Sequence, residues 1–240
     1  QLIFSEGIDF HPIPISGDTR ENFIVVESSS GSQFRFGMEG PLIFDQEVQN
    51  CLKIIEPALI GADFLVASGS LAPGMPVDFY AQLALLSKKS NCRLILDTSG
   101  KALELAARTG AYLLKPNLNE LSLLMGREEL QAEEIKDSAQ ELIRKGFCEI
   151  MVVSLGQAGA MMVSKDSVFQ VSAPLVKKQS TVGAGDSMVA GLVWSLSREM
   201  DLKSALQFGV ACGTAATMNP GTELCRKEDV ERLFEWIRKS

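Results

Sequence analysis

The strongest constraint on the fold is a series of short apolar segments that end in small polar residues and alternate with helical stretches. The segments that predict buried strands are 62–70, 92–100, 111–117 and 148–156. Between them, apolar residues recur with helical spacing at 77–89 and 131–146. Repeated strand and helix units predict an α/β fold with a doubly wound, mostly parallel sheet.

The second half of the chain completes this pattern. Segments 159–164 and 167–174 predict two strands joined by a tight turn at Lys165 and Asp166, and helices are predicted at 184–198, 201–218 and 227–238. Doubly wound sheets bind ligands beyond the carboxyl ends of their strands. Polar segments follow four of the predicted strands, with the sequences SGS, DTSG, KPN and SLG. We therefore expect the functional site at this edge of the sheet.

Residues 20–45 have a different character. Residues 22–40 alternate around a Ser/Gly turn, which predicts a two-stranded β-ribbon with Phe34 and Phe36 on one face. An isolated hairpin is only marginally stable in water. The ribbon is therefore expected to cover its own core, a partner chain or a ligand.

Composition excludes several classes of partner. The net charge of −7 and the sequence pI of about 4.9 argue against electrostatic binding to nucleic acid or to an anionic membrane. No segment reaches about 18 consecutive apolar residues, so no membrane span is predicted. Backbone N–H groups and a few cations still suffice for a small polyanion such as ATP.

The cysteines and the histidine indicate neither disulfides nor zinc. The chain has 5 cysteines, far apart and without a C-x-x-C pair, which is typical of a protein in the reducing cytoplasm. The one histidine, His11, excludes a His-rich metal site. The chain starts at Gln1 without a methionine or a signal-peptide pattern, and we expect its natural N-terminus to be missing.

The segment Gly183-Ala184-Gly185-Asp186 stands at the start of a predicted helix. Successive N–H groups at a helix start bind anions, and glycines let a phosphate approach the backbone closely. A carboxylate there is suited to take a proton from a substrate hydroxyl while the turn binds a transferring phosphoryl group. The alternative is an ordinary glycine-rich turn with an acid in the first helical turn. This motif alone favours neither interpretation.

The segment KPNLNE offers Lys115, Asn117 and Glu120 beyond another strand. An amide and a carboxylate are suited to Mg²⁺ held partly through water, with phosphate nearby. The alternative is a helix start in which Asn117 is the cap and Glu120 completes a capping box. Taken alone, the segment favours the capping box.

Two further residues are candidate sugar contacts. Ser70, in SGSLAPG, follows a strand, although turn chemistry explains its presence equally well. Arg20, in GDTREN, could bind a phosphate through two hydrogen bonds, although a lone surface arginine is usually only solvated. Neither a P-loop nor a Rossmann glycine pattern is present in the sequence.

With these motifs in this order, the chain resembles the pfkB, or ribokinase-like, family of sugar kinases from about Arg20 to its C-terminus. The resemblance is carried by STVGAGDSMVAG, SGSLAPG, LDTSG, LKPNLNEL, VVSLGQAGA and FGVACGTAATMNPGT. Within the family, TREN, FRFGMEG and KKQSTVGAGDSM are most similar to the bacterial type-2 6-phosphofructokinases. The 1-phosphofructokinases and tagatose-6-phosphate kinases are close relatives, so the choice of phosphosugar stays open.

The resemblance implies transfer of the γ-phosphoryl group of ATP to fructose 6-phosphate, giving fructose 1,6-bisphosphate. It identifies Asp186 as the catalytic base, with an anion hole formed by Gly183, Ala184 and Gly185. The residues implied in binding ATP are Lys115, Asn117, Glu120, Ser154, Gly156, Thr181 and Asn219. Mg²⁺ would be held at Asn117 and Glu120 through water or phosphate. The residues implied around a monovalent cation, K⁺, are Ser180, Val182, Ala216, Asn219 and Gly221.

For the sugar, the resemblance implies that Arg20 holds the phosphate and that Ser70 contacts the ring. The whole chain, 1–240, would be one kinase domain in which 20–45 forms a β lid. In relatives this lid closes over the sugar and often forms a dimer interface, so a homodimer is expected.

Two features depart from the family pattern. The family's N-terminal region, with its first strand, an aspartate for the sugar hydroxyls and a Gly-Gly-rich substrate loop, is absent from this chain. The sugar pocket is therefore expected to be incomplete. In addition, Glu223 stands where close type-2 relatives tend to have a basic residue, which bears on the cation site.

Two other classes of function remain open from the sequence. The chain could be a non-catalytic protein that binds a nucleotide or a sugar phosphate, which the missing N-terminal block favours. It could also be a structural α/β domain whose motifs are all ordinary turns, which the agreement of so many motifs in order disfavours. The intact GAGD and KPNLNE segments favour the phosphosugar kinase.

Overall fold

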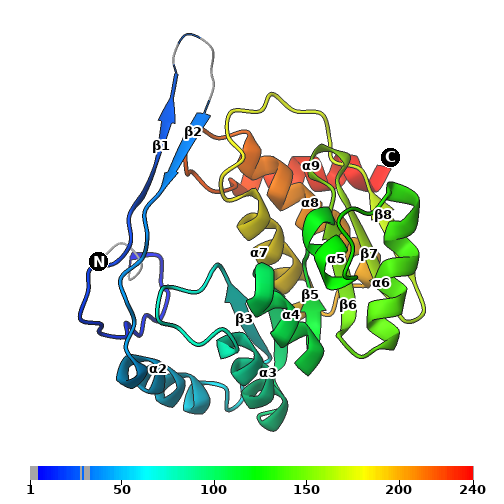
Figure 1. The fold of residues 1–240 in the computed structure, drawn as a ribbon. Helices are drawn as coiled ribbons and strands as arrows, with labels where there is room; N and C mark the ends of the chain where they lie inside the picture. The colour runs from blue at the N-terminus through cyan, green and yellow to red at the C-terminus, as the bar shows by residue number, and fades with distance from the viewer. Residues whose placement is uncertain (1–4, 28, 30–32, 240) are drawn as a thin grey trace. The chain divides into compact units, whose positions relative to one another are not determined.

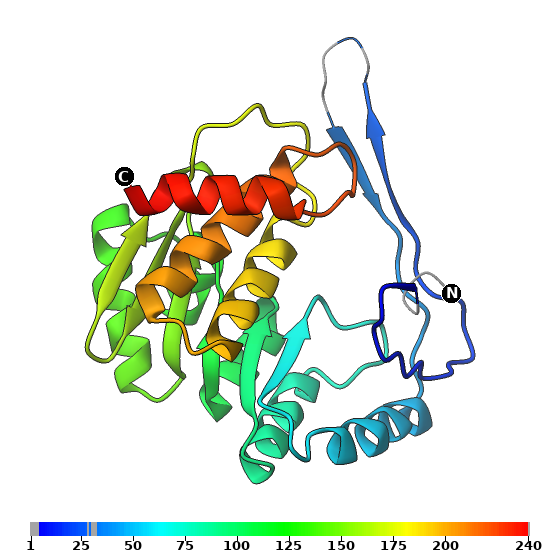
Figure 2. The ribbon, with the colours of Figure 1, turned by 180° about the vertical axis from the view of Figure 1, so that it is seen from behind.

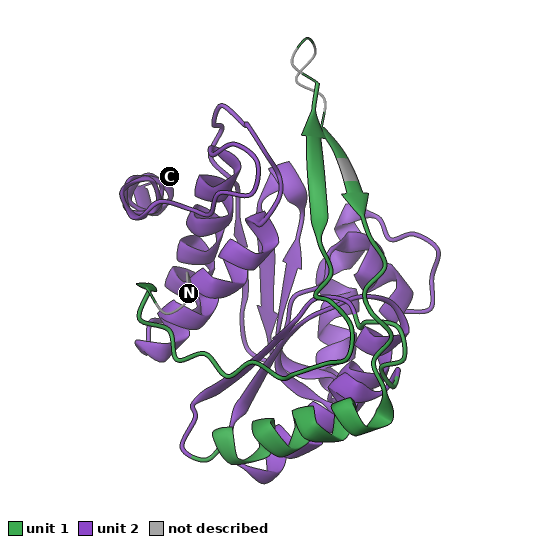
Figure 3. Cartoon of the chain, turned by 90° about the vertical axis from the view of Figure 1, so that its left-hand side faces the viewer, with its two compact units in different colours: residues 1–60, 71–76 green, residues 61–70, 77–240 purple. Residues whose placement is uncertain are grey.

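The computed structural model describes residues 5–27, 29 and 33–239, without the side chain of Arg35. The chain divides into two compact units, one of residues 1–60 with 71–76 and the other of residues 61–70 with 77–240 (Figure 3). The predicted ribbon segment, 20–45, belongs to the first unit. That the whole chain, 1–240, acts as one kinase domain stays a prediction.

The first unit contains the predicted ribbon. Strands β1 (Asn22–Val26) and β2 (Gln33–Gly37) pair antiparallel, with Phe23 opposite Phe36 and Val25 opposite Phe34. The rings of Phe23 and Phe36 stack with their centroids 5.3 Å apart. The ribbon and its shared face are thus confirmed, whereas residues 28 and 30–32 of the Ser/Gly turn lie outside the described residues.

The first unit also contains a helix that the sequence analysis did not predict, α2 (Asp45–Ala58). Its start is held by Glu47, whose carboxylate accepts hydrogen bonds from the N–H of Phe44 at 2.8 Å and from Ser16. These hydrogen bonds lower the pKa of Glu47, and the one from Phe44 has the largest effect. Glu47 thereby joins the start of α2 to a segment 31 residues earlier in the chain.

The second unit is built on a six-stranded sheet whose strands follow one another in chain order. They are β3 (Phe64–Ser68), β4 (Arg93–Asp97), β5 (Ala111–Leu114), β6 (Cys148–Ser154), β7 (Ala160–Ser164) and β8 (Val168–Val171). The first four are parallel, and β7 and β8 are antiparallel to their neighbours. Every one lies within its predicted segment, and Lys165 and Asp166 form the predicted turn between β7 and β8.

Helices cover both faces of this sheet, which confirms the doubly wound α/β prediction. One face carries α3 (Phe79–Lys89), α4 (Gly100–Thr109), α5 (Leu118–Leu124) and α6 (Ile135–Arg144), shown in Figure 1. The other carries α7 (Ala184–Ser197), α8 (Leu202–Thr217) and α9 (Lys227–Lys239), shown from behind in Figure 2. Two short 3-10 helices also occur, η1 (Ala132–Glu134) and η2 (Gly156–Ala158).

Small residues let α7 and α8 approach closely. A Cβ atom added at Gly191 would lie 2.7 Å from the Sγ of Cys212, and one added at Gly209 would lie 2.9 Å from the Cγ of Leu192. Leu192 and Leu206 are fully buried in the core between these helices and the sheet. A Cβ atom added at Gly213 would lie 3.0 Å from the carbonyl oxygen of Ala184, so the same close packing reaches the first turn of α7, which carries the GAGD segment.

Two predictions from composition can be compared with the structure. Within the parts of the chain that the structure describes, no helix combines the length and the apolar character needed to cross a membrane. The five cysteines are all free thiols, and Cys92, Cys148 and Cys212 are buried in the second unit. The expectation of a chain without a disulfide framework stays a prediction.

Candidate active site

The carboxyl ends of the parallel strands bring several predicted residues together. Asp97 is the last residue of β4, and Lys115 follows the last residue of β5. Since Leu96 pairs with Leu114 in the parallel register, Asp97 and Lys115 are lateral neighbours. One step further along the edge, Asn117 bridges to Ser154 at the end of β6. The expected site edge is thus formed by three adjacent strands.

The first turn of α7 presents the predicted anion-binding segment. Gly183 caps the helix with φ +75°, a left-handed conformation that glycine adopts readily. The first backbone hydrogen bond into the helix is donated by Ser187 to Gly183, so the N–H groups of Ala184, Gly185 and Asp186 are free of intrahelical partners. Gly185 and Asp186 are exposed. This geometry is suited to an anion beside an accessible carboxylate.

A pocket of about 500 Å³ opens beside this turn, within the second unit. Of the residues predicted to bind the nucleotide, four line it: Asn117, Ser154, Gly156 and Thr181. Its wall also includes Ala184, Gly185, Met188, Val210, Thr214 and Thr217. A largely apolar pocket of this size, with a few polar groups and an anion-binding turn at one end, matches the usual dimensions of cofactor sites.

Lys115 and Asp97 form a largely buried ion pair at the floor of the site. The Nζ of Lys115 lies 3.0 Å from the Oδ1 of Asp97, and the two side chains are 7% and 17% exposed. Burial raises the pKa of Asp97; the positive charge of Lys115 opposes this increase, and the charge of Asp186 adds to it. Asp97 had no predicted role, although the sequence shows an acid at the end of a predicted strand and a lysine at the end of the next one.

Asn117 and Glu120 form the capping box that the sequence analysis offered as an alternative to a metal site. The Oδ1 of Asn117 accepts a hydrogen bond from the N–H of Glu120 at 2.9 Å, and the N–H of Asn117 donates to Glu120 Oε2 at 2.8 Å. Burial raises the pKa of Glu120, and this backbone hydrogen bond and the charge of Lys115 act against the increase. Both side chains lie at the site edge while they cap α5.

The predicted cation residues lie in two segments that are joined by hydrogen bonds. The hydroxyl of Ser180 donates to the carbonyl of Gly221 at 2.7 Å, and its N–H donates to Thr217 at 3.2 Å. The amide of Asn219 donates to the carbonyl of Leu224 at 2.8 Å. Through this hydrogen bond, the side chain of Asn219 closes the loop of residues 219–224. Asn219 is not among the residues that line the described pocket.

Near these segments, Val182 and Ala216 complete the predicted cation set. The N–H of Val182 donates to the hydroxyl of Ser180 at 3.2 Å, and Ala216 lies buried in the last turn of α8. Glu223, which departs from the family pattern, pairs with Arg226 at 2.8 Å on the surface. Its negative charge is thus already balanced by a neighbouring cation.

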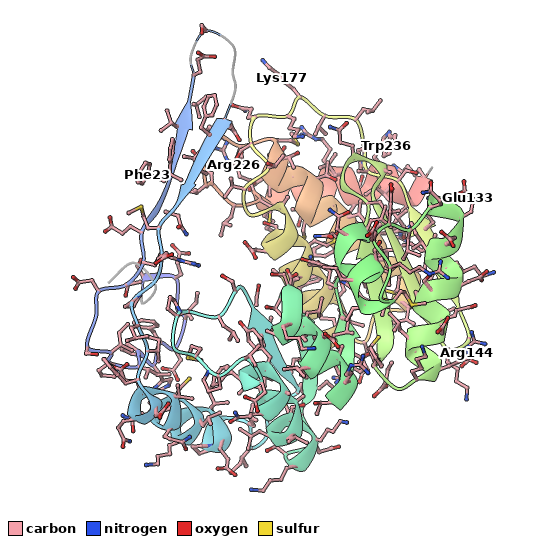
Figure 4. All side chains as sticks on the ribbon, in the orientation of Figure 1. Phe23, Glu133, Arg144, Lys177, Arg226 and Trp236 are labelled. Atoms are coloured by element: carbon pink, nitrogen blue, oxygen red, sulfur yellow. The ribbon has the colours of Figure 1, made fainter. Side chains whose placement is uncertain are left out.

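The remaining predicted residues, Ser70 and Arg20, belong to different units. Ser70 is exposed two residues beyond the end of β3, and Arg20 is exposed just ahead of β1. Lys178, which was not among the predicted residues, lines the pocket from the loop between β8 and α7. Its neighbour Lys177 projects outward from the same loop (Figure 4). Two adjacent lysines ahead of a glycine-rich turn were the available indication in the sequence.

Comparison with known proteins gives a consistent result. The family model described as pfkB family carbohydrate kinase matches residues 1–229. The ATP-dependent 6-phosphofructokinase isozyme 2 of Mycobacterium tuberculosis is 41% identical over 234 residues, covering 98% of this chain and 69% of that protein. The isozyme of the same name from Escherichia coli is 38% identical, covering 99% and 77%. A 1-phosphofructokinase of Bacillus subtilis is 32% identical, covering 93% and 72%.

Solved structures agree in fold. Phosphofructokinase-2 from Escherichia coli in complex with potassium superimposes with a TM-score of 0.91 at 37% identity, covering 99% of this chain and 77% of that one. The tetrameric inhibited form of the same enzyme gives 0.88 at 35% identity, covering 99% and 76%. A ribokinase of Arabidopsis thaliana shares the fold, with a TM-score of 0.67 at 20% identity. The match covers 90% of this chain and 69% of that one.

Proposed function

The chain belongs to the pfkB family of carbohydrate kinases, and we propose that it transfers the γ-phosphoryl group of ATP to the 1-hydroxyl of fructose 6-phosphate. The product would be fructose 1,6-bisphosphate. The observation that carries the proposal is the convergence of a free helix N-terminus, an exposed Asp186 and a buried lysine beside one pocket. The relatives named 6-phosphofructokinase cover nearly the whole chain.

In the proposed reaction Asp186 takes the proton of the attacking hydroxyl. The hydroxyl oxygen forms a bond to the γ-phosphorus, the bond to the bridging oxygen breaks, and ADP leaves. The N–H groups of Ala184 and Gly185, together with the ammonium of Lys115, stabilise the charge on the transferring group. Phosphoryl transfer needs little covalent chemistry from a protein, so positioning and electrostatics supply most of the rate.

The metal ions are part of this proposal. Among the described residues no cluster of three His, Cys, Asp or Glu side chains could hold a metal by itself. Asn117 and Glu120, already engaged as a cap, fit Mg²⁺ that is bound mainly through phosphate oxygens and water, as is usual for this ion. When bound, Mg²⁺ would neutralise phosphate charge. The segments of Ser180 and Gly221 are the proposed K⁺ region, and a potassium complex of the Escherichia coli relative supports it.

The nucleotide is proposed to occupy the pocket of about 500 Å³. Asn117, Ser154, Gly156 and Thr181 line it, and its apolar wall is suited to a base while the first turn of α7 is suited to phosphates. We also propose that Arg20 and Ser70 contact the sugar. The cysteine pattern supports a cytoplasmic location for the same protein.

Self-association through the ribbon is a further part of the proposal. One face of the ribbon carries four apolar side chains that are each about half exposed: Phe23, Val25, Phe34 and Phe36. A lone hairpin with such an exposed face is only marginally stable in water. We expect the wild-type protein to be a dimer and the Phe23→Asp, Phe36→Asp variant to be a monomer in sedimentation velocity. Val26→Asp, on the opposite face, is the matched control. Unchanged sedimentation of the double variant would exclude this interface.

The substrate is tested by a coupled ADP-release assay on the full-length protein. Fructose 6-phosphate, fructose 1-phosphate and tagatose 6-phosphate are offered in turn, with and without Mg²⁺ and with K⁺ or Na⁺. We expect the highest kcat/KM with fructose 6-phosphate, a requirement for Mg²⁺ and a higher rate with K⁺. A preference for fructose 1-phosphate would favour 1-phosphofructokinase, and a preference for tagatose 6-phosphate the third alternative. ATP binding without ADP release on any sugar would favour a non-catalytic binding protein.

A further inference from the structure

The ion pair of Asp97 and Lys115 is formed by two adjacent strands. Because Leu96 of β4 pairs with Leu114 of β5 in parallel, the residues that follow them, Asp97 and Lys115, present side chains next to each other. The backbone N–H of Lys115 donates to the carbonyl of Leu96 at 3.1 Å, which fixes the lateral alignment. The side-chain contact of 3.0 Å is therefore a consequence of sheet register, and both partners lie on rigid elements.

This pair contacts the segment that is proposed to bind the transferring phosphoryl group. A Cβ atom added at Gly185 would lie 3.7 Å from the Nζ of Lys115 and 4.0 Å from the Oδ2 of Asp97. The lack of a side chain at Gly185 thus leaves the ammonium next to the free N–H groups of the first turn of α7. The ammonium and these N–H groups can bind oxygens of the same phosphate.

A lysine in this position has competing partners. The charges of Lys115 and Asp97 both act on the pKa of Glu120, and the charge of Asp186 acts on the pKa of Asp97, so Asp97 lies within electrostatic reach of the other three groups. The lysine side chain has a long flexible stem and three donors. An ammonium without a fixed partner would be drawn toward the carboxylate of Asp186 and would occupy the group that must accept the hydroxyl proton.

We propose that Asp97 is a positioning residue for the phosphoryl transfer: it holds the ammonium of Lys115 beside the first turn of α7 and keeps it away from Asp186. This inference rests on the proposed function. It assigns a role to Asp97, the acid of the LDTSG segment. The sequence motifs predicted no role for this residue, and it does not line the pocket. Asp97 acts through Lys115, so its effect depends on the presence of that lysine.

The test is a double-mutant cycle on the full-length protein, with kcat and KM measured for ATP and fructose 6-phosphate. Asp97→Asn is expected to lower kcat about 10²-fold, the loss typical of a misplaced group, with little change in KM for fructose 6-phosphate. In a Lys115→Met background the same change should alter kcat by less than about twofold, because the partner is already absent. Asp63→Asn, an exposed acid ahead of β3, is the matched control and should behave like wild type.

Two outcomes would overturn the inference: wild-type kcat in a folded Asp97→Asn variant, or an equal loss with and without Lys115. If Asp97→Asn does not fold, the comparison uses Lys115→Met and the double variant. The double variant leaves neither charge, and in Lys115→Met burial favours the neutral, protonated form of Asp97. Equal kcat in those two supports the inference, and a further loss in the double variant contradicts it. Failure of the proposed function is recognised separately, because wild type itself would then release no ADP with fructose 6-phosphate.

Discussion

Asp186→Asn is expected to lower kcat by about 10²–10⁴-fold, the usual contribution of a general base, while the KM for ATP stays similar. Asparagine has the same shape and cannot accept the hydroxyl proton. The carboxylate is exposed in the first turn of α7, so its loss leaves no buried group without a partner. The effect is therefore expected in catalysis and not in folding. Steady-state kinetics and a thermal unfolding curve measure both.

The matched control is Asp166→Asn, which removes the same charge from the exposed turn between β7 and β8. It should leave kcat and the unfolding temperature at wild-type values. Turnover of Asp186→Asn close to that of this control would exclude Asp186 as the base. A large rise in the KM for ATP with unchanged kcat would instead indicate a binding role.

Gly159→Ala has the largest expected effect on stability. Gly159 has φ +95°, and a Cβ atom there would lie 1.9 Å from the carbonyl oxygen of Val171 and 2.7 Å from the N of Ala173. Both are backbone atoms, and Val171 pairs with Ala160 in the sheet, so a shift that relieves the clash would disturb the pairing of β7 and β8. We expect a loss of about 4 kcal/mol or more in the free energy of unfolding. In a chain of this size, that lowers the unfolding temperature by about 10 °C or more.

Gly156→Ala separates the clash from backbone strain. Gly156 also has positive φ, +58°, but a Cβ atom there meets nothing within 4 Å. It should therefore cost only about 1–2 kcal/mol, the strain of a left-handed conformation for an L-residue. Circular dichroism during thermal unfolding measures both variants. Equal unfolding temperatures for the two would contradict the packing described around Gly159.

The strands and the long helices were predictable because apolar residues are frequent in them and recur at strand or helix spacing. Each predicted strand is a short apolar run that ends in polar residues, and the structure gives β3–β8 within those segments. Helix α7 carries apolar residues at helical spacing, and its predicted range of 184–198 ends one residue beyond the observed end. Burial of one face imposes this pattern on the sequence, so the pattern indicates the fold.

Helices α2 and α4 were not predicted, and for α5 the sequence indicated only the capped start, for separate physical reasons. Helix α5 has 7 residues, under two turns, which is too short for a periodic pattern. The buried face of α4 is mostly alanine, which marks a core-facing position less clearly than Leu, Ile or Val does. In α2, Val48 is the one residue described as buried, so little of its sequence is constrained by a core. The 131–146 segment was predicted as one helix, but its first turn is 3-10.

The site was predictable one residue at a time, but its pairings were not. The polar strand ends and the glycine-rich turn each indicated where Lys115 and Asp186 would lie. The contact between Asp97 and Lys115 depends on the lateral register of β4 and β5, which a single sequence does not specify. The capping box of Asn117 and Glu120, in contrast, was indicated by the sequence because both residues belong to one local segment, and the structure confirms it.

The most direct test of the central claim is ³¹P NMR of the full-length protein incubated with ATP, Mg²⁺ and fructose 6-phosphate. We predict one new phosphomonoester signal, from a phosphoryl group on C1 of the sugar, for each ADP released. Asp186→Asn should give neither the phosphomonoester signal nor the signals of ADP on the same time scale. Release of inorganic phosphate in place of a sugar bisphosphate, or an unchanged ATP spectrum with the wild-type protein, would contradict the account.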